Sequence, residues 1–171
     1  GSWAGIETKE AQELIKNSQS FCHGGGIHAI PIATYVFAQM LRSIKSIDEH
    51  IDLQKNKDWK QMTSVGELTD MTIGITGFGG IGQEVARIGL GIGMNVIATD
   101  DLVPSAPISI DFFNGQNITI NIDTISKEEV LKEADFITLH VPSQEGYIIS
   151  ADEFDTMKMG VGVVNASRGG V

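Results

Sequence analysis

Hydrophobic positions along the chain change their spacing several times, and each change marks a new predicted element. From Ala29 to about His50, apolar residues recur every three or four positions, which predicts a helix. Residues 71–76 are a short apolar run and predict a buried strand, after which residues 81–92 return to helical spacing. Further apolar runs predict strands at 95–99, 118–122, 136–141 and 161–165.

Two more helices are predicted from their first turns. Ser126 and Ser150 are each followed three residues later by a glutamate, the pattern of a capping box that starts a helix. Residues 48–64 are polar and irregular, and residues 101–117, with two prolines and an Asn-Gly pair, are expected to be a loop. Strands that alternate with helices predict an α/β fold with a doubly wound parallel sheet, whose ligands bind at the carboxyl ends of the strands.

A glycine-rich turn follows the strand predicted at 71–76. Gly77, Gly79 and Gly82 have the G-x-G-x-x-G spacing of a dinucleotide-binding turn. Glycine at these positions permits a tight turn, lets the backbone approach a pyrophosphate, and lets the next helix pack close to the strand. The N–H groups and positive dipole end of that helix then face the phosphates. The segment therefore predicts a dinucleotide site.

An acid at the end of the next predicted strand supports this prediction. Asp100 lies eighteen residues after Gly82, close to the spacing of about 20 expected for an acid that binds the adenosine ribose hydroxyls. With Asp101 beside it and no arginine nearby, the site disfavours a 2′-phosphate, so NAD is favoured over NADP. The alternative is that Asp100 only forms a turn.

Composition excludes several classes of function. A formal net charge of −10 argues against nucleic acid as a partner and provides no basic stripe for a membrane surface. Cys22 is the one cysteine, so an internal disulfide is impossible and a reducing compartment, the cytoplasm, is expected. His23 and His28 could be metal ligands, but no cluster at ligand spacing accompanies them and no metal site is predicted.

Several motifs fall in a distinctive order along nearly the whole chain. They are Ala4-Gly5-Ile6-Glu7, Gly26-Ile27-His28-Ala29, the Gly77–Gly82 turn, Gly93-Met94-Asn95-Val96-Ile97-Ala98, Ala134-Asp135-Phe136-Ile137-Thr138-Leu139-His140-Val141-Pro142 and Asn165-Ala166-Ser167-Arg168-Gly169-Gly170-Val171. Because of these motifs, the sequence resembles the D-isomer-specific 2-hydroxyacid dehydrogenases, which include phosphoglycerate dehydrogenase and glyoxylate/hydroxypyruvate reductase. The resemblance implies a Rossmann-like NAD-binding domain.

The resemblance also implies roles for individual residues. Arg168 matches the catalytic arginine that grips the substrate carboxylate and polarises the 2-oxo group, which suits a planar, bidentate guanidinium. The backbone of Ala4, Gly5 and Ile6 matches the loop that holds the other side of that carboxylate. Cofactor-lining positions are implied at Gly77, Phe78, Gly79, Gly80, Ile81, Gly82, Asp100, His140, Val141, Pro142, Ala166 and Ser167. A catalytic role for His140 is not implied.

The implied reaction is oxidation of the CH–OH group of a D-2-hydroxy acid, or reduction of the 2-oxo acid, with NAD(H) as hydride carrier. In the family the histidine and acid that move the proton lie downstream of the arginine, and here only three residues follow Arg168. We therefore expect an excised and inactive fragment whose sheet is cut short before its last strands. Residues 1–28 would be the tail of a substrate-binding domain and the connection, and residues 29–171 an NAD-binding domain.

Three departures from the family pattern bear on the site. Thr34 replaces the usual glutamate of the linking helix, Gly80 replaces an arginine that contacts the cofactor phosphate, and residues 143–146 form a shorter loop. The family commonly dimerises through its cofactor domain, and the apolar helix from Ile32 is a candidate surface for a homodimer.

Two other functions remain open. An NAD-sensing module of the corepressor type shares this fold and these motifs and would bind the cofactor without catalysis. Another enzyme on a dinucleotide fold, such as an adenosylhomocysteinase-like protein or a methyltransferase, is disfavoured by the run Ala166-Ser167-Arg168-Gly169-Gly170.

Overall fold

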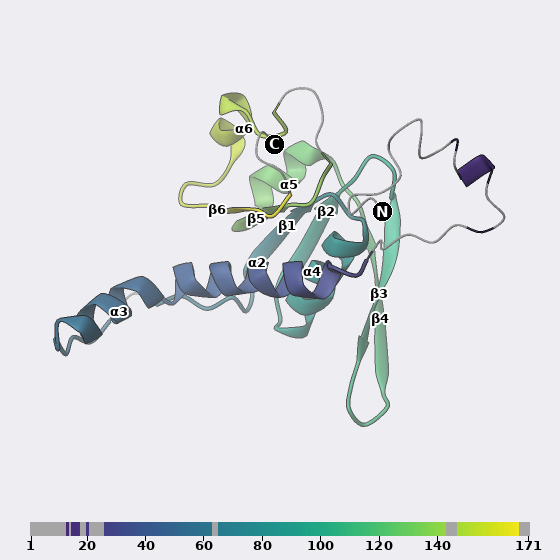
Figure 1. Ribbon diagram of the computed structural model, residues 1–171. Helices are drawn as coiled ribbons and strands as arrows, with labels where there is room; N and C mark the ends of the chain where they lie inside the picture. The colour runs from purple at the N-terminus through teal and green to yellow at the C-terminus, as the bar shows by residue number, and fades with distance from the viewer. Residues whose placement is uncertain are drawn as a thin grey trace.

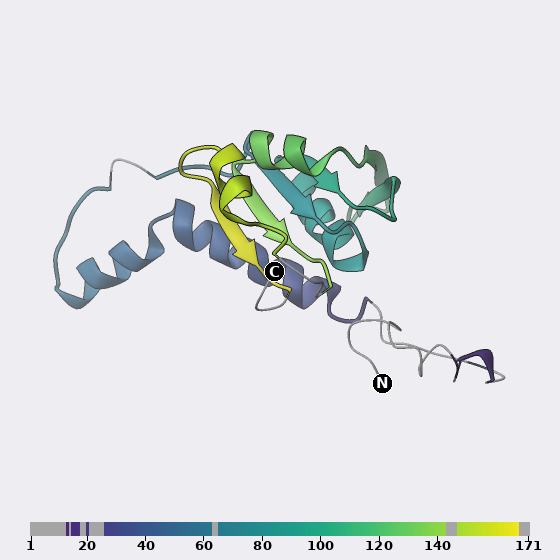
Figure 2. The same ribbon diagram turned by 90° about the horizontal axis from the view of Figure 1, so that it is seen from above.

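The fold is built on a four-stranded parallel sheet with helices on both faces (Figures 1 and 2). The computed structural model describes residues 13, 15–17, 20, 26–62, 65–142 and 147–167. Strands β1 (Thr72–Thr76), β2 (Asn95–Thr99), β5 (Phe136–Leu139) and β6 (Gly162–Asn165) lie in the order β2-β1-β5-β6. The predicted α/β fold with a doubly wound parallel sheet is confirmed.

Helices α2 (Ala29–Ile44) and α4 (Gly80–Gly91) cover one face of the sheet. They pack against each other, and their buried side chains meet Ile73 and Ile75 of β1 in the main core. On α4 the buried positions are Gly82, Val85, Ala86 and Gly89, while Ile92 beyond its end is 41% exposed. The predicted helix is therefore correct, but its buried stripe includes two glycines because the helix lies close to β1, β2 and α2.

Helix α5 (Lys127–Glu133) covers the opposite face and contacts helix α6 (Ala151–Thr156). Both begin with the predicted capping boxes, in which Ser126 or Ser150 and the glutamate three residues later bond each other's backbone N–H. Lys127 also donates to Glu153 at 2.6 Å, which links the first turns of the two helices. These hydrogen bonds lower the pKa of Glu153 to about 2, so the link persists throughout the neutral and mildly acidic range.

The helix predicted from Ala29 to about His50 is interrupted, and this prediction of one continuous helix is wrong. Helix α2 ends at Ile44, Ser46 has a left-handed backbone with φ of 47°, and helix α3 follows at Ile47–Lys55. Helix α3 has no buried residue and extends away from the sheet (Figure 1). The three-residue spacing of apolar side chains continues through Ser46, so periodicity alone could not locate the break.

The loop predicted at 101–117 is wrong for residues 105–111, which form a strand, and holds for 101–104 and 112–116 on either side of it. Strand β3 (Ser105–Asp111) pairs in antiparallel register with β4 (Asn117–Asp123), so a hairpin leads from β2 towards α5. Its inner half buries Ala106, Ile108 and Ile122 in the core, and its outer half projects beyond the sheet (Figure 1). A proline inside the strand and an Asn-Gly pair at the hairpin turn concealed the alternation of apolar and polar residues.

Strand β6 is an edge strand of the four-stranded sheet, as its order in the sheet shows. Val163 on this edge is 38% exposed, whereas Phe136 of the adjacent strand β5 is buried. No helix within the described part of the chain is long and apolar enough to cross a membrane.

Candidate functional site

The glycine turn joins β1 to α4 at the carboxyl end of the sheet. Gly77 has φ of +93°, in the left-handed region that favours glycine, and a Cβ on it would lie 2.7 Å from the carbonyl oxygen of His140. The side chain of Val141 is also close, because its Cγ1 would be 3.0 Å from the same Cβ. The end of β5 therefore packs directly against this turn and leaves room only for glycine.

Gly82 lies in the first turn of α4 and faces the strand that precedes the helix. A Cβ at this position would overlap the carbonyl oxygen of Gly77 and lie 3.1 Å from the side chain of Ile75. The missing side chain allows the start of α4 to approach the end of β1, as the spacing of the glycines predicted.

Gly79 and Gly80 border open space at the start of the same helix. Among the described residues, a Cβ on Gly79 would meet no atom within 4 Å, and one on Gly80 would meet only the Cα of Gly26, at 3.8 Å. Gly79 is the N-cap of α4, and no side-chain hydrogen bond caps the helix there. Space is therefore open beside the start of α4, where the first backbone N–H groups of a helix have no partner within it, and this arrangement fits a pyrophosphate.

Asp100 lies beside this turn at the end of β2. Its Oδ2 accepts a hydrogen bond of 2.6 Å from the backbone N–H of Phe78. Its Oδ1 accepts bonds from the N–H groups of Leu102 at 2.8 Å and Val103 at 3.0 Å. The carboxylate is therefore held firmly next to the glycine turn, where the predicted acid for the ribose should lie.

His140 follows β5 and is half-buried next to the turn. Its Nε2 lies 2.9 Å from the hydroxyl of Thr138, and no described residue bonds its Nδ1. Burial lowers the pKa of His140 to about 4, so the imidazole is neutral at physiological pH. A neutral imidazole engaged with Thr138 is poorly suited to supply a proton, in line with the absence of an implied catalytic role.

Hydrogen bonds between the strand ends bring the predicted site residues to one edge of the sheet. The N–H of Gly77 donates to Thr99 at 2.9 Å, and the N–H of His140 donates to Thr76 at 2.8 Å. Ala166 and Ser167 follow β6, and Asn165 accepts hydrogen bonds from the N–H and the hydroxyl of Ser167 at 3.0 and 2.9 Å. Because all four strands are parallel, these segments share the carboxyl edge with the turn.

The predicted substrate contacts come from two ends of the chain. Ala4, Gly5, Ile6 and Arg168 lie outside the described residues, as do positions 143–146 of the short loop. Thr34, where the family usually has a glutamate, is exposed on α2 and bonds the backbone of Ile30 at 2.9 Å. Among the residues that the structure describes, no three histidine, cysteine or acidic side chains are grouped to hold a metal ion.

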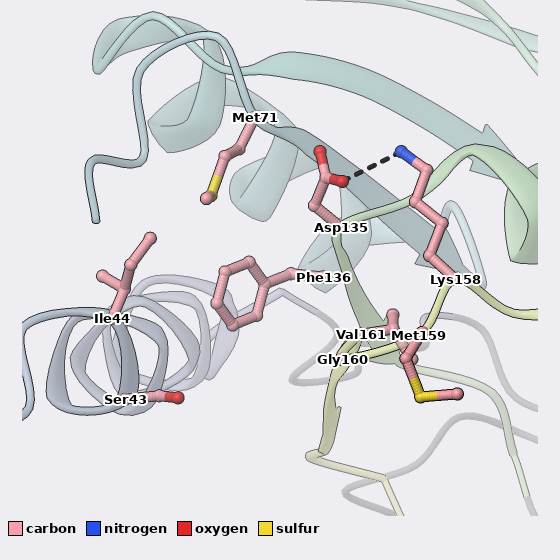
Figure 3. A pocket seen from close by; sticks show the side chains of 9 residues that line it. All are labelled: Ser43, Ile44, Met71, Asp135, Phe136, Lys158, Met159, Gly160 and Val161. Atoms are coloured by element: carbon pink, nitrogen blue, oxygen red, sulfur yellow. Dashed lines mark hydrogen bonds and ion pairs between the residues drawn. The ribbon is translucent and has the colours of Figure 1, made fainter. Parts of the chain in front are cut away.

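A separate cavity of about 280 Å³ lies between the end of α2 and the start of β5 (Figure 3). Its walls include Ile44, Met71 and Phe136, and an ion pair of 2.9 Å between Asp135 and Lys158 borders it. Asp135 and Phe136 stand at the amino end of β5. This cavity therefore lies at the amino ends of the strands, whereas Gly77 lies at their carboxyl ends, and it is no part of the glycine-turn site.

The chain matches the family model for the NAD binding domain of D-isomer specific 2-hydroxyacid dehydrogenases over residues 37–171. It is 32% identical to a hydroxypyruvate reductase of Thermotoga maritima, an alignment that covers 97% of this chain and 51% of the relative. It is also 32% identical to a D-3-phosphoglycerate dehydrogenase of Methanocaldococcus jannaschii, with 98% of this chain and 31% of the relative covered. The chain thus spans about half or less of the length of these two relatives.

A solved structure agrees with the sequence relatives. The D-lactate dehydrogenase of Aquifex aeolicus, in complex with NAD and lactic acid, has a TM-score of 0.67 and 30% identity, and the match covers 81% of this chain and 40% of that one. The sheet and the covering helices of the two proteins therefore share one fold.

Proposed function

The chain belongs to the NAD-binding domains of the D-isomer specific 2-hydroxyacid dehydrogenases, and we propose that it serves NAD-dependent oxidation of D-2-hydroxy acids or reduction of 2-oxo acids. The main support for this proposal is that the glycine turn and Asp100 lie side by side at the carboxyl ends of the strands. That edge is where a parallel α/β sheet binds its ligand.

The cofactor's pyrophosphate would lie against Gly79 and Gly80 at the start of α4, where space is open. The ribose hydroxyls would bond Asp100, and a carboxylate there favours NAD over NADP. The remaining residues proposed to line the cofactor are Gly77, Phe78, Ile81, Gly82, His140, Val141, Pro142, Ala166 and Ser167.

When bound, NAD supplies the hydride chemistry at its nicotinamide ring. The chain's own residues would bind and orient the small 2-hydroxy or 2-oxo acid. Arg168 would hold the carboxylate in a bidentate contact, and the backbone of Ala4, Gly5 and Ile6 would hold its other side. Two regions distant in sequence would thus enclose one carboxylate, with residues 29–171 as the NAD-binding domain and residues 1–28 leading to it from the substrate side.

The 171-residue chain by itself is expected to bind NAD and to give no measurable reduction of 2-oxo acids. His140, in the described part of the crevice, is neutral and bonded to Thr138, so it is poorly suited to supply the proton. Isothermal titration with NAD, followed by an absorbance assay with NADH and glyoxylate, hydroxypyruvate or pyruvate, measures both properties. The absence of NAD binding would contradict the proposal, and turnover by the chain alone would contradict its expected inactivity.

The same assay on a longer protein that contains this chain separates an enzyme from an NAD-sensing module. Reduction of a 2-oxo acid by the longer protein supports the proposed oxidoreductase. Binding of NAD without turnover of any of these acids would instead favour the corepressor type of module.

We also propose that the protein is a homodimer that associates through α2 and α3. Several large apolar side chains on these helices are exposed, including Tyr35 at 54%, Leu41 at 42% and Ile51 at 41%. Exposed large apolar side chains are typical of surfaces that contact another protein.

Leu41→Glu is expected to shift the mass of the protein from that of a dimer to that of a monomer, because it places a charge in the proposed contact. Light scattering coupled to size exclusion measures this mass. Phe113→Glu is the matched control, because Phe113 is fully exposed at the tip of the hairpin and outside the proposed surface. A monomeric wild type, or a Leu41→Glu variant that stays dimeric, would contradict the proposed interface.

A further inference from the structure

We propose that Asp100 is a positioning residue for the glycine turn as well as an acceptor for the ribose. In this second role its carboxylate fixes the backbone at Phe78 before any cofactor binds. Loss of Asp100 should therefore weaken the binding of the phosphates, and not only that of the ribose. The inference rests on the proposed NAD site and deepens it.

The turn is tied to the end of β2 by two successive N–H groups. The N–H of Gly77 donates to the backbone oxygen of Thr99 at 2.9 Å, and the N–H of Phe78 donates to Oδ2 of Asp100 at 2.6 Å. The second bond is charge-assisted, which makes it shorter and stronger than a bond between neutral groups. Thr99 thus binds the turn through its backbone, and Asp100 binds it through its side chain.

The carboxylate is itself held in place. Its other oxygen accepts the N–H groups of Leu102 and Val103, which begin the loop after β2. A carboxylate has about four lone-pair sites, and three are used by the backbone. Acceptor capacity is left for a ribose hydroxyl, so the two roles are compatible.

Phe78 connects the carboxylate of Asp100 to the phosphate site. Its side chain is fully buried in the core, and it is followed directly by Gly79, the N-cap of α4. Gly77 before it already has a left-handed backbone that few residues could adopt. Without the carboxylate, the part-buried N–H of Phe78 would lose its acceptor, and a group left unsatisfied in this way favours rearrangement of the turn.

Two nucleotides separate the two roles. ADP offers both the ribose hydroxyls and the diphosphate, whereas 2′,3′-dideoxy-ADP offers the diphosphate without the hydroxyls. If Asp100 acted only on the ribose, Asp100→Ala would leave the affinity for 2′,3′-dideoxy-ADP unchanged. We expect instead that Asp100→Ala weakens the binding of 2′,3′-dideoxy-ADP about tenfold, the effect of losing one charge-assisted hydrogen bond, and weakens ADP further.

Two further variants distinguish a local effect of Asp100 on binding from a loss of folding. Asp101→Ala removes the same charge from the next residue, which is exposed, and should leave the affinity for 2′,3′-dideoxy-ADP unchanged. Asp100→Asn keeps the shape and one acceptor oxygen, but the amide nitrogen cannot accept the N–H of Phe78. It should therefore also lose affinity for 2′,3′-dideoxy-ADP while unfolding at nearly the wild-type temperature.

Titration calorimetry supplies the affinities, and the amide proton resonance of Phe78 provides an independent readout. That resonance should move upfield in both Asp100 variants and stay in place in Asp101→Ala. Wild-type affinity for 2′,3′-dideoxy-ADP in folded Asp100→Ala would overturn the positioning role while leaving the NAD site intact. Failure of the wild type to bind either nucleotide would overturn the proposed function together with this inference.

Discussion

Gly82→Val should destabilise the fold by about 3 kcal/mol, at the upper end of the usual cost of overpacking, and should weaken NAD binding by roughly tenfold or more. The added Cβ would overlap the carbonyl oxygen of Gly77, which is backbone and cannot rotate away like the end of a side chain. The start of α4 would have to move away from β1. The same movement displaces the N–H groups that are proposed to face the pyrophosphate.

Gly91→Ala is the matched control for this variant because it lies in the same helix. A Cβ on Gly91 meets no atom of the described part of the chain within 4 Å, so the substitution should be neutral or stabilise the helix by about 0.5–1 kcal/mol. Chemical denaturation gives the free energy of unfolding, and titration with NAD gives the affinity. Equal stability of Gly82→Val and the wild type would show that the close packing at this glycine is not required.

Gly80→Arg should strengthen NAD binding about tenfold at low ionic strength, which corresponds to about 1.4 kcal/mol. The family resemblance places a phosphate-contacting arginine at this position. The described residues leave room for a side chain, since a Cβ on Gly80 meets none of their atoms within 4 Å except the Cα of Gly26 at 3.8 Å. A guanidinium at the start of α4 would add a charge-assisted contact with the phosphate, beside the contacts from the backbone N–H groups already there.

Gly80→Ala separates the effect of charge from the effect of helix propensity. Alanine should stabilise α4 by up to about 1 kcal/mol relative to glycine without changing the affinity for NAD. The gain from arginine should also shrink as salt is added, because exposed charges are screened. An equal gain from alanine and arginine, or a gain independent of salt, would rule out a new contact with the phosphate.

Patterns within short stretches of sequence were enough to predict much of the sheet. The strand at 95–99 was predicted with the bounds that β2 has, and the capping boxes at Ser126 and Ser150 start α5 and α6. These features depend on residues close together in the chain, such as an apolar run or a serine with a glutamate three positions later. The positions of Gly77 and Gly82 were likewise predicted, because their spacing has a specific mechanical reason.

Predictions that depended on longer-range packing were less successful. Residues 105–111 contain a proline and were expected to be a loop, but they form β3 because β4 pairs with them and the core covers the inner half of the hairpin. The break at Ser46 was missed because polar and apolar spacing continues through it. The hydrogen bond from Phe78 to Asp100 joins residues 22 positions apart, and no local pattern signals it.

The sequence by itself determined the family, the alternation of strands and helices, and the glycine turn with an acid at the end of the following strand. Each of these follows from the spacing of residue types along the chain. Only the tertiary structure decided that β3 and β4 form a hairpin, and that the carboxylate of Asp100 bonds the turn it was predicted to accompany. Such pairings depend on which distant groups can satisfy one another's hydrogen bonds once the core has formed.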